Sequence, residues 1–282
     1  MNQRKVNLFM VGAAKCGTTT IHKILAQHPD IYAGPIKEPH FFVRDEFKPH
    51  EGYRKRIALN EATYLENYAG ATQEKYLVDS SVHYLYFEKS AADIKAYNPE
   101  AKIIIVLRHP VDRIYSHYKM LRKDGVTHMS FDQFIKNPID NNQIDLIKQG
   151  FYSESIKRYL SIFGKDRVLI LKFDLVKNQE ALKKVLSEFL EIAPFEIEKA
   201  EHENAGGIPK NEFLRYLHID FIGTRFLKRI LPKSKFRSMI GSWVMGHFYS
   251  SKPMDPMIRK QLEEIYTNEL QDLKDLGFTF ER

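Results

Sequence analysis

The chain has 282 residues, of which 43% are hydrophobic, so it can bury a sizeable core and suits a single domain spanning residues 1–282. Lysine and arginine total 43 against 36 aspartates and glutamates, and the net charge of +7 favours an anionic ligand or substrate. Cys16 is the single cysteine, which excludes an intrachain disulfide, and no apolar run approaches the ~18 residues of a membrane span.

The first predicted element is a strand at residues 6–11. A basic start precedes it, but the apolar run is too short for a signal peptide, so we expect a cytoplasmic protein. Three further apolar runs bounded by turn signals predict strands at residues 76–78, 102–107 and 168–173. The run at 102–107 shows no polar alternation, which predicts a strand buried on both faces in the middle of a sheet.

Helical patterns follow or separate these strands at residues 18–27, 153–163, 179–190 and 257–276. The alternation predicts an α/β fold, a parallel sheet flanked by helices. In the last helix we expect Asp255 as N-cap and Pro256 at the first helical position, with Gly277 ending it. Its apolar face comprises Ile258, Leu262, Ile265, Leu270, Leu273 and Leu276.

A small-residue turn, "VGAAKCGTTT" at residues 11–20, joins the first strand to the first helix. Such a turn directs backbone N–H groups and the positive end of a helix at one point, which suits a phosphate. Gly12 and Gly17 allow a close backbone approach. The residues that present these groups are Lys15, Cys16, Gly17, Thr18, Thr19 and Thr20.

Two common classes of phosphate-binding enzyme, nucleotide triphosphatases and cysteine phosphatases, have loop patterns that this turn does not match. A nucleotide triphosphatase loop needs a lysine directly after its second glycine, where this chain has Thr18, and Arg108 stands where a metal-binding aspartate is expected. A cysteine phosphatase needs an arginine six positions after its nucleophile, where this chain has His22. We therefore interpret Cys16 as a small loop residue rather than a nucleophile.

The loop "AAKCGTTT", with its lysine two residues before the glycine, resembles the phosphosulfate-binding loop of sulfotransferases that use 3′-phosphoadenosine 5′-phosphosulfate (PAPS). The resemblance implies a P-loop-like sulfotransferase fold, PAPS as donor with no metal, and Lys15 beside the leaving phosphate. It also implies that residues 16–20 of the turn contact the donor.

The stretch "IIIVLRHPVDRIYSHY" places Arg108 at the end of a buried strand and Ser116 in the following helix. Ligands of open α/β sheets bind at such strand ends, where a guanidinium and a hydroxyl can hold a monophosphate. It resembles the R-x-P…S pattern by which sulfotransferases bind the donor's 3′-phosphate. Asp112 and Arg113 are expected to make capping and structural contacts.

Two further similarities to the family lie later in the chain. The segment around "QGFYSES" resembles the family's G-x-Y unit, which implies that Tyr152 lies near the adenine. The loop "HENAGGIPKN" at residues 202–211 resembles one that closes over the nucleotide in bacterial and heparan-type members, which implies a donor contact from Lys210.

The candidate catalytic stretch is "GPIKEPHFF" at residues 34–42, where Pro39 is expected to hold Glu38 and His40 in an extended conformation. It resembles the K-E-x-H-F-F segment of carbohydrate sulfotransferases such as the heparan sulfate enzymes. The resemblance implies Glu38 as the general base, with Lys37 assisting on the sulfuryl oxygens. A neutral imidazole also suits proton transfer near pH 7, so His40 and His83 are the alternative bases.

One segment departs from the heparan-type pattern E-K-[TS]-P-x-Y. In "VDSSVHYLY", residues 78–86, Ser80 replaces the lysine and Val82 the proline, while Tyr84 keeps its place. A substrate-binding cation is therefore absent there, which argues against a heparan-like acceptor.

The resulting interpretation is a sulfotransferase that transfers the sulfuryl group of PAPS to a hydroxyl acceptor, a carbohydrate rather than an amine or a phenol. The alternatives are a nucleotide kinase with an aberrant loop and a non-catalytic nucleotide- or polyanion-binding protein. Residues 219–253 are basic and aromatic, and nucleic-acid binding through them is a weaker alternative that predicts steeply salt-dependent affinity.

Overall fold

A computed structural model describes residues 4–46, 57–140, 144–194, 208–209, 249–250 and 252–280. Its main sheet has five strands in the order β2-β3-β1-β4-β5, all paired in parallel. The strands are β1 (Leu8–Gly12), β2 (Ile31–Ala33), β3 (Tyr76–Asp79), β4 (Lys102–Leu107) and β5 (Val168–Lys172). A small antiparallel pair joins β6 (Ile208–Pro209) to β7 (Tyr249–Ser250). The predicted α/β fold with a parallel sheet is confirmed.

The two strands between β3 and β5 are the most buried part of the sheet. Every residue of β1 is buried, and β4 is buried from Ile103 to Leu107. Such strands carry apolar side chains on both faces because helices cover both sides of the sheet. The interior place predicted for β4 is confirmed, but β1 holds the middle position, and the short strand β2 was missed.

Helices follow or separate the strands along the described part of the chain. They are α1 (Thr18–Leu25), α3 (Glu61–Glu66), α4 (Lys89–Tyr97), α5 (Pro110–Lys123), α6 (Phe131–Phe134), α7 (Ser153–Phe163), α8 (Phe173–Lys177), α9 (Gln179–Leu190), α13 (Pro256–Ile265) and α14 (Thr267–Asp275), with short 3-10 turns η1 (Phe41–Val43), η2 (Lys148–Gly150) and η3 (Lys165–Arg167). Helices α7 and α9 have the predicted bounds, whereas α1 ends two residues early. None of these helices combines the length and hydropathy that a membrane crossing requires.

The predicted closing helix is two helices. Tyr266 breaks it, because its buried hydroxyl donates to the carbonyl of Ile147 at 2.7 Å. Thr267 then bonds back to carbonyls of the preceding turn, a contact that bends helices. The break leaves Ile265 47% exposed, so its predicted place on the buried face is wrong. Asp255 caps α13 as predicted, accepting from the Met257 N–H at 2.7 Å.

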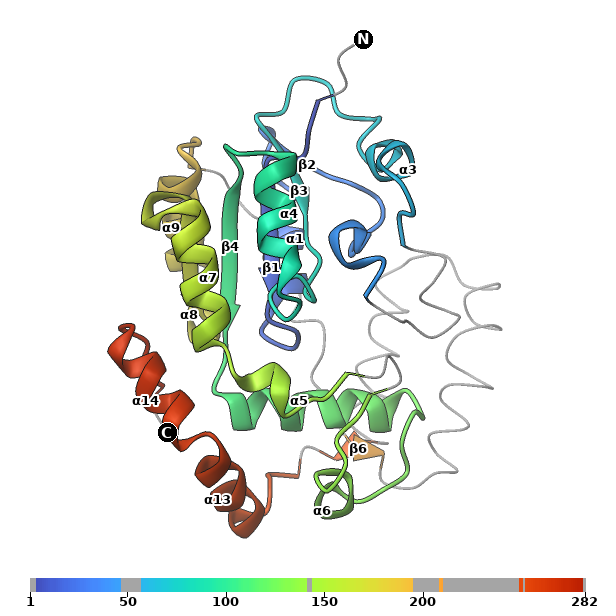
Figure 1. The fold of residues 1–282 in the computed structure, drawn as a ribbon, viewed down its shortest axis with the longest axis vertical. Helices are drawn as coiled ribbons and strands as arrows, with labels where there is room; N and C mark the ends of the chain where they lie inside the picture. The colour runs from blue at the N-terminus through green and yellow to red at the C-terminus, as the bar shows by residue number, and fades with distance from the viewer. Residues whose placement is uncertain are drawn as a thin grey trace.

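The strand order reverses at β1, since β3 lies on one side of it and β4 on the other. In open parallel sheets this reversal opens a crevice at the carboxyl ends of the strands. Figure 1 shows helix α5 running across the end of β4 at this edge, with α13 and α14 beside it. A second buried cluster, which includes Ile114 and Leu262, joins α5 to these closing helices.

Candidate active site

The loop between β1 and α1 begins the site. Gly17 is the N-cap of α1 and adopts a φ of 85°, in the left-handed region that favours glycine. A Cβ at this position would lie 3.1 Å from Val176 and 3.2 Å from Phe173. No side-chain hydrogen bond caps α1, so the N–H groups of Thr18 and Thr19 stand at its open end, as an anion requires.

Lys15 lies in this loop with its ammonium group 3.3 Å from the sulfur of Met120 on α5. Burial lowers the pKa of Lys15; Lys123 and Arg108 lower it further, whereas Asp124 and Glu38 oppose the shift. An anionic ligand stabilises a partly desolvated ammonium that lies among other cations more strongly than it stabilises an ammonium in open water. Lys15 is thus placed to neutralise a phosphate at the helix end.

Cys16 is fully buried, and its sulfur lies 3.6 Å from the carbonyl oxygen of Ala14. Burial raises the pKa of the thiol to about 11, so it is a thiol rather than a thiolate at neutral pH. This burial agrees with the interpretation of Cys16 as a loop residue rather than a nucleophile, which stays a prediction.

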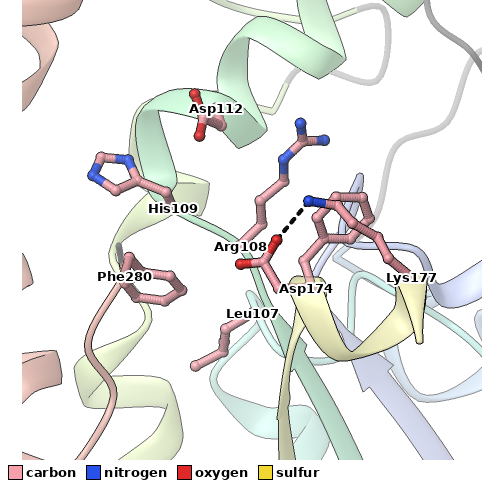
Figure 2. Close-up of a pocket in the computed structure, with 8 residues that line it drawn as sticks. Leu107, Arg108, His109, Asp112, Asp174, Lys177 and Phe280 are labelled. Carbon is pink, nitrogen blue, oxygen red and sulfur yellow. Dashed lines mark hydrogen bonds and ion pairs between the residues drawn. The ribbon is translucent and has the colours of Figure 1, made fainter. Parts of the chain in front are cut away.

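Arg108 leaves the end of β4 and reaches the same loop. Its guanidinium donates to the carbonyl oxygen of Lys15 at 3.4 Å and lies 4.5 Å above the ring of Phe173. Figure 2 shows this side chain rising toward α5, beside the ion pair of Lys177 and Asp174, whose charged atoms lie 2.6 Å apart. The surrounding cavity of about 360 Å³ is lined by Leu107, Arg108, His109, Asp112, Phe173, Asp174, Lys177 and Phe280.

The neighbours of Arg108 on α5 have different surroundings. Ser116 is half-buried on the helix and is not among the described residues that line the cavity. Arg113 is fully buried and donates to the backbone at Leu146 and, at 3.2 Å, to Gln149. Asp112 pairs with Arg259 of α13. The structural contacts expected of Asp112 and Arg113 are confirmed, whereas the expected capping role is wrong, because the N-cap of α5 is His109, whose ring accepts from the Val111 N–H at 3.3 Å.

Tyr152 lies beneath this edge of the sheet. It is 1% exposed, and its hydroxyl donates to the carbonyl oxygen of Arg108 at 3.2 Å. In this position the ring supports the end of β4, while its contact with adenine stays a prediction. Lys210 and nearly all of the 202–211 loop lie outside the described residues.

The segment with Glu38 lies next to the loop. The Glu38 carboxylate is 2.5 Å from the ammonium of Lys37 and 3.8 Å from Nε2 of His40. The expected extended conformation is wrong, because φ is 64° at Glu38 and 51° at His40. Tertiary contacts override the local preference before proline: the His40 N–H donates to the Ser81 hydroxyl, and the chain turns at once into η1.

Two further imidazoles lie near His40 or near the turn after β3. The rings of His40 and His83 lie 5.0 Å apart, and Nδ1 of His22 lies 2.8 Å from the Ser80 hydroxyl. Burial lowers the pKa of His22 and of His83 to about 4, so both are neutral at pH 7. The charge of Glu38 raises the pKa of Lys15 and of both histidines, so the segment with Glu38 lies close enough to the loop to interact with it electrostatically.

Sequence reasoning missed several residues of this site. No local pattern assigned a role to Asp79, although its buried carboxylate accepts three hydroxyl hydrogen bonds. Phe173 was predicted only as the end of a strand, whereas it starts α8 beneath Arg108. Within the described ranges, no group of three or more His, Cys, Asp or Glu side chains is arranged to hold a metal ion.

An uncapped helix end, a lysine and an arginine at the reversal point of a parallel sheet are typical of P-loop-like proteins, which bind anions at this place. The model of the sulfotransferase domain family matches residues 5–274, and the chain therefore belongs to that family. The family resemblance of the loop is confirmed.

Solved and curated relatives agree with this membership. The crystal structure of a sulfotransferase from Alicyclobacillus acidocaldarius superposes with a TM-score of 0.72 at 26% identity, covering 99% of this chain and 98% of that one. Mouse carbohydrate sulfotransferase 15 is 23% identical over 67% of this chain and 44% of its own length. Bovine bifunctional heparan sulfate N-deacetylase/N-sulfotransferase 2 is 29% identical over 68% and 22%. The chain thus spans less than half the length of these curated relatives.

Proposed function

We propose that this sulfotransferase transfers the sulfuryl group of PAPS to a hydroxyl of a carbohydrate acceptor, with Glu38 as general base. The observation that carries the proposal is that the Arg108 guanidinium donates to the backbone carbonyl of Lys15, so that both cationic residues stand at the reversal point of the sheet. PAPS carries anionic groups at both ends of its ribose, which suits two neighbouring cationic positions.

Each residue proposed to bind PAPS contacts a particular part of it. Lys15 and the N–H groups of Gly17, Thr18 and Thr19 hold the 5′-phosphosulfate, and Arg108 with Ser116 holds the 3′-phosphate. The N–H groups of Cys16 and Thr20 donate to the carbonyls of Ala13 and Gly17, so these two residues shape the loop around the donor. The Arg108 guanidinium packs against the ring of Phe173, and the Tyr152 hydroxyl donates to the Arg108 carbonyl. Because these contacts already hold the side chain, it loses little conformational entropy when PAPS binds. Lys210 contributes a further cation from the 202–211 loop.

The reaction requires one proton transfer and one neutralised leaving group. The acceptor oxygen bonds to sulfur while the bond from sulfur to the bridging phosphate oxygen breaks. Glu38 takes the acceptor's hydroxyl proton. The leaving group, adenosine 3′,5′-bisphosphate (PAP), keeps the electron pair of the broken bond, and Lys15 and the loop amides stabilise its new charge. Lys37, 2.5 Å from Glu38, orients the sulfuryl oxygens.

Glu38 is better placed as a base than the neighbouring imidazoles. His83 is 5% exposed, so an acceptor hydroxyl reaches its imidazole less easily than the Glu38 carboxylate. His40 is fully buried under the segment, whereas Glu38 keeps an exposed edge of 15% that an acceptor can reach. We assign His40 a structural role beside the base.

A carbohydrate acceptor is supported by the names of the two curated relatives, which denote carbohydrate and heparan sulfate sulfotransferases. This chain has Ser80 where the heparan-type pattern has a lysine. The neighbouring His22 does not replace that positive charge, because burial lowers the pKa of His22 to about 4 and its imidazole is therefore neutral at pH 7. We therefore expect a hydroxyl acceptor that is less anionic than heparan sulfate. Radiolabelled PAPS with a panel of p-nitrophenyl glycosides, glucosamine and desulfated heparin tests this choice.

Calorimetric titration with PAP in EDTA, beside ATP with magnesium, tests the donor site. We expect metal-free PAP to bind and ATP to bind weakly, and Arg108→Ala to weaken PAP binding by on the order of tenfold to a hundredfold, as for loss of a charge-assisted contact. Arg167→Ala is the matched control, since Arg167 pairs with Glu100 at the opposite end of the sheet. Equal losses in both variants, or tighter binding of ATP, would refute the donor assignment.

The base is tested by Glu38→Gln, which keeps the shape of the side chain and removes its proton affinity. We expect kcat to fall by on the order of a hundredfold or more while PAP binds as in the wild type. Glu66→Gln on the exposed face of α3 is the control and leaves both values unchanged. A Glu38→Gln variant with normal turnover would move the role of base to another group.

A further inference from the structure

The backbone around Glu38 is held in an unusual conformation. Glu38 and His40 both have positive φ values, 64° and 51°, and neither residue is glycine. Each such residue costs on the order of 1–3 kcal/mol, so the conformation persists only where its surroundings impose it. Proline at position 39 does not impose it, because proline favours an extended residue before it.

Two side-chain hydroxyls from the turn after β3 hold this backbone. The Ser81 hydroxyl accepts from the His40 N–H at 3.1 Å, and the Tyr84 hydroxyl accepts from the Phe42 N–H at 3.4 Å. Both contacts are buried and join segments about forty residues apart in the chain. They fix the backbone directly before η1 and within it, and hence the direction of the Glu38 side chain.

Asp79 sets the orientation of both hydroxyls. The Ser81 hydroxyl donates to Oδ1 of Asp79 at 2.6 Å, and the Tyr84 hydroxyl donates to Oδ2 at 2.9 Å. Because each hydroxyl hydrogen is directed at the carboxylate, each oxygen offers its lone pairs to a backbone N–H. The Tyr64 hydroxyl also donates to Oδ2, at 2.8 Å. Asp79 is 1% exposed, and these three donors compensate its buried charge.

We propose that Asp79 is a positioning residue for the general base: through the hydroxyls of Ser81 and Tyr84 it holds the 38–42 backbone so that Glu38 meets the acceptor hydroxyl. The inference rests on the proposed function of Glu38. Asp79 contacts neither donor nor acceptor, so it acts on the proton-transfer step rather than on donor binding.

Two tyrosines provide a matched comparison. Tyr84→Phe and Tyr64→Phe each remove one buried hydroxyl that donates to the same carboxylate oxygen. Only the Tyr84 hydroxyl also accepts from the catalytic segment, whereas Tyr64 contacts that segment through its ring, stacked 4.6 Å from Phe41, which phenylalanine retains. We expect Tyr84→Phe and Ser81→Ala to lower kcat by about tenfold or more, with the KM for PAPS unchanged, and Tyr64→Phe to leave kcat near the wild-type value.

Asp79→Asn gives the direct test, and Ser81→Ala replaces it should that variant fail to fold. We expect kcat to fall in Asp79→Asn, PAP to bind with unchanged affinity in calorimetry, and the amides of His40 and Phe42 to exchange hydrogen faster. Equal kcat losses in Tyr84→Phe and Tyr64→Phe, or no loss in either, would overturn the positioning role.

The hydrogen-exchange measurement separates this inference from the proposed function. A wild-type protein that binds PAP but transfers no sulfuryl group in the acceptor panel refutes the proposed function. In that case faster exchange at His40 and Phe42 in Asp79→Asn, but not in Tyr64→Phe, still supports the positioning of the segment by Asp79. Unchanged exchange in Asp79→Asn overturns it.

Discussion

Cys16 illustrates how burial decides the chemistry of a residue. It stands in a loop that leads into the N-terminus of a helix, where thiols in other settings become thiolates. In this loop the side chain is fully buried, and the loss of solvent outweighs the nearby cations Arg113 and Arg108, so the pKa of the thiol rises to about 11. The same position in an exposed loop would be reactive.

We expect Cys16 to resist alkylation in the folded protein. Iodoacetamide should label it at least about a hundredfold more slowly than in the urea-unfolded chain, because both exposure and thiolate content are low. Mass spectrometry of the labelled protein measures the two rates. Cys16→Ala should still bind PAP, because the loop acts through its backbone. Rapid labelling of the native protein would contradict the burial of this thiol.

At the scale of elements, the helix after Gly150 depends on a distant carboxylate. Tyr152 is the N-cap of α7 without a side-chain cap of its own. Glu269 of α14 supplies the cap instead, accepting from the N–H groups of Tyr152 and Ser153 at 2.7 and 2.8 Å and from the Ser153 hydroxyl at 2.8 Å. The charge also complements the positive end of the helix dipole. Because the Tyr152 hydroxyl donates to the carbonyl of Arg108, this cap connects the closing helices to the proposed donor site.

Glu269→Gln should therefore destabilise the protein by about 1–3 kcal/mol, the range for a buried, charge-assisted cap. Urea unfolding measures the loss. Glu264→Gln on the exposed face of α13 is the control and should change stability by less than about 0.5 kcal/mol. Matching stabilities for the two variants would show that Glu269 does not cap α7.

Most elements could be predicted because their signals are local. The β-branched run of β4, the amphipathic pattern of α7 and the Asp255–Pro256 start of α13 each depend on a few neighbouring residues. The break at Tyr266 could not be predicted, because it arises from a hydrogen bond to Ile147 in another part of the chain. Likewise, the left-handed backbone at Glu38 runs against its own sequence signal.

At the scale of the whole molecule, two buried groups whose pKa values are shifted in opposite directions affect the free energy of unfolding at acidic pH. Burial lowers the pKa of His83 to about 4, below that of an unfolded histidine, so the unfolded chain gains a proton first as pH falls. Burial raises the pKa of Asp79 to about 6, above that of an unfolded aspartate, so at this group the folded chain gains the proton first. Acidification therefore weakens folding through His83 and strengthens it through Asp79.

Two variants should consequently change the pH dependence of stability in opposite directions. Between about pH 7 and about pH 5, His83→Gln should lose less stability than the wild type, and Asp79→Asn should lose more. Urea midpoints measured at both pH values give the comparison. If the urea midpoints of both variants changed between the two pH values as much as that of the wild type, neither His83 nor Asp79 would have a shifted pKa in the folded protein. The single domain and the cytoplasmic location stay predictions.

Local signals were enough to predict the strand–loop–helix unit around Lys15, the strand that ends at Arg108, and the family, because glycine, β-branched and capping residues act within a few positions of one another. Three other features are visible in the folded chain alone: the conformation of Glu38, the contacts that support Arg108 and the burial that raises the pKa of the Cys16 thiol. These features arise from contacts between distant segments, such as the 117 residues that separate Tyr152 from Glu269. A buried hydrogen bond of this kind leaves no periodic pattern in the chain, since its partners meet only after the sheet has brought them together.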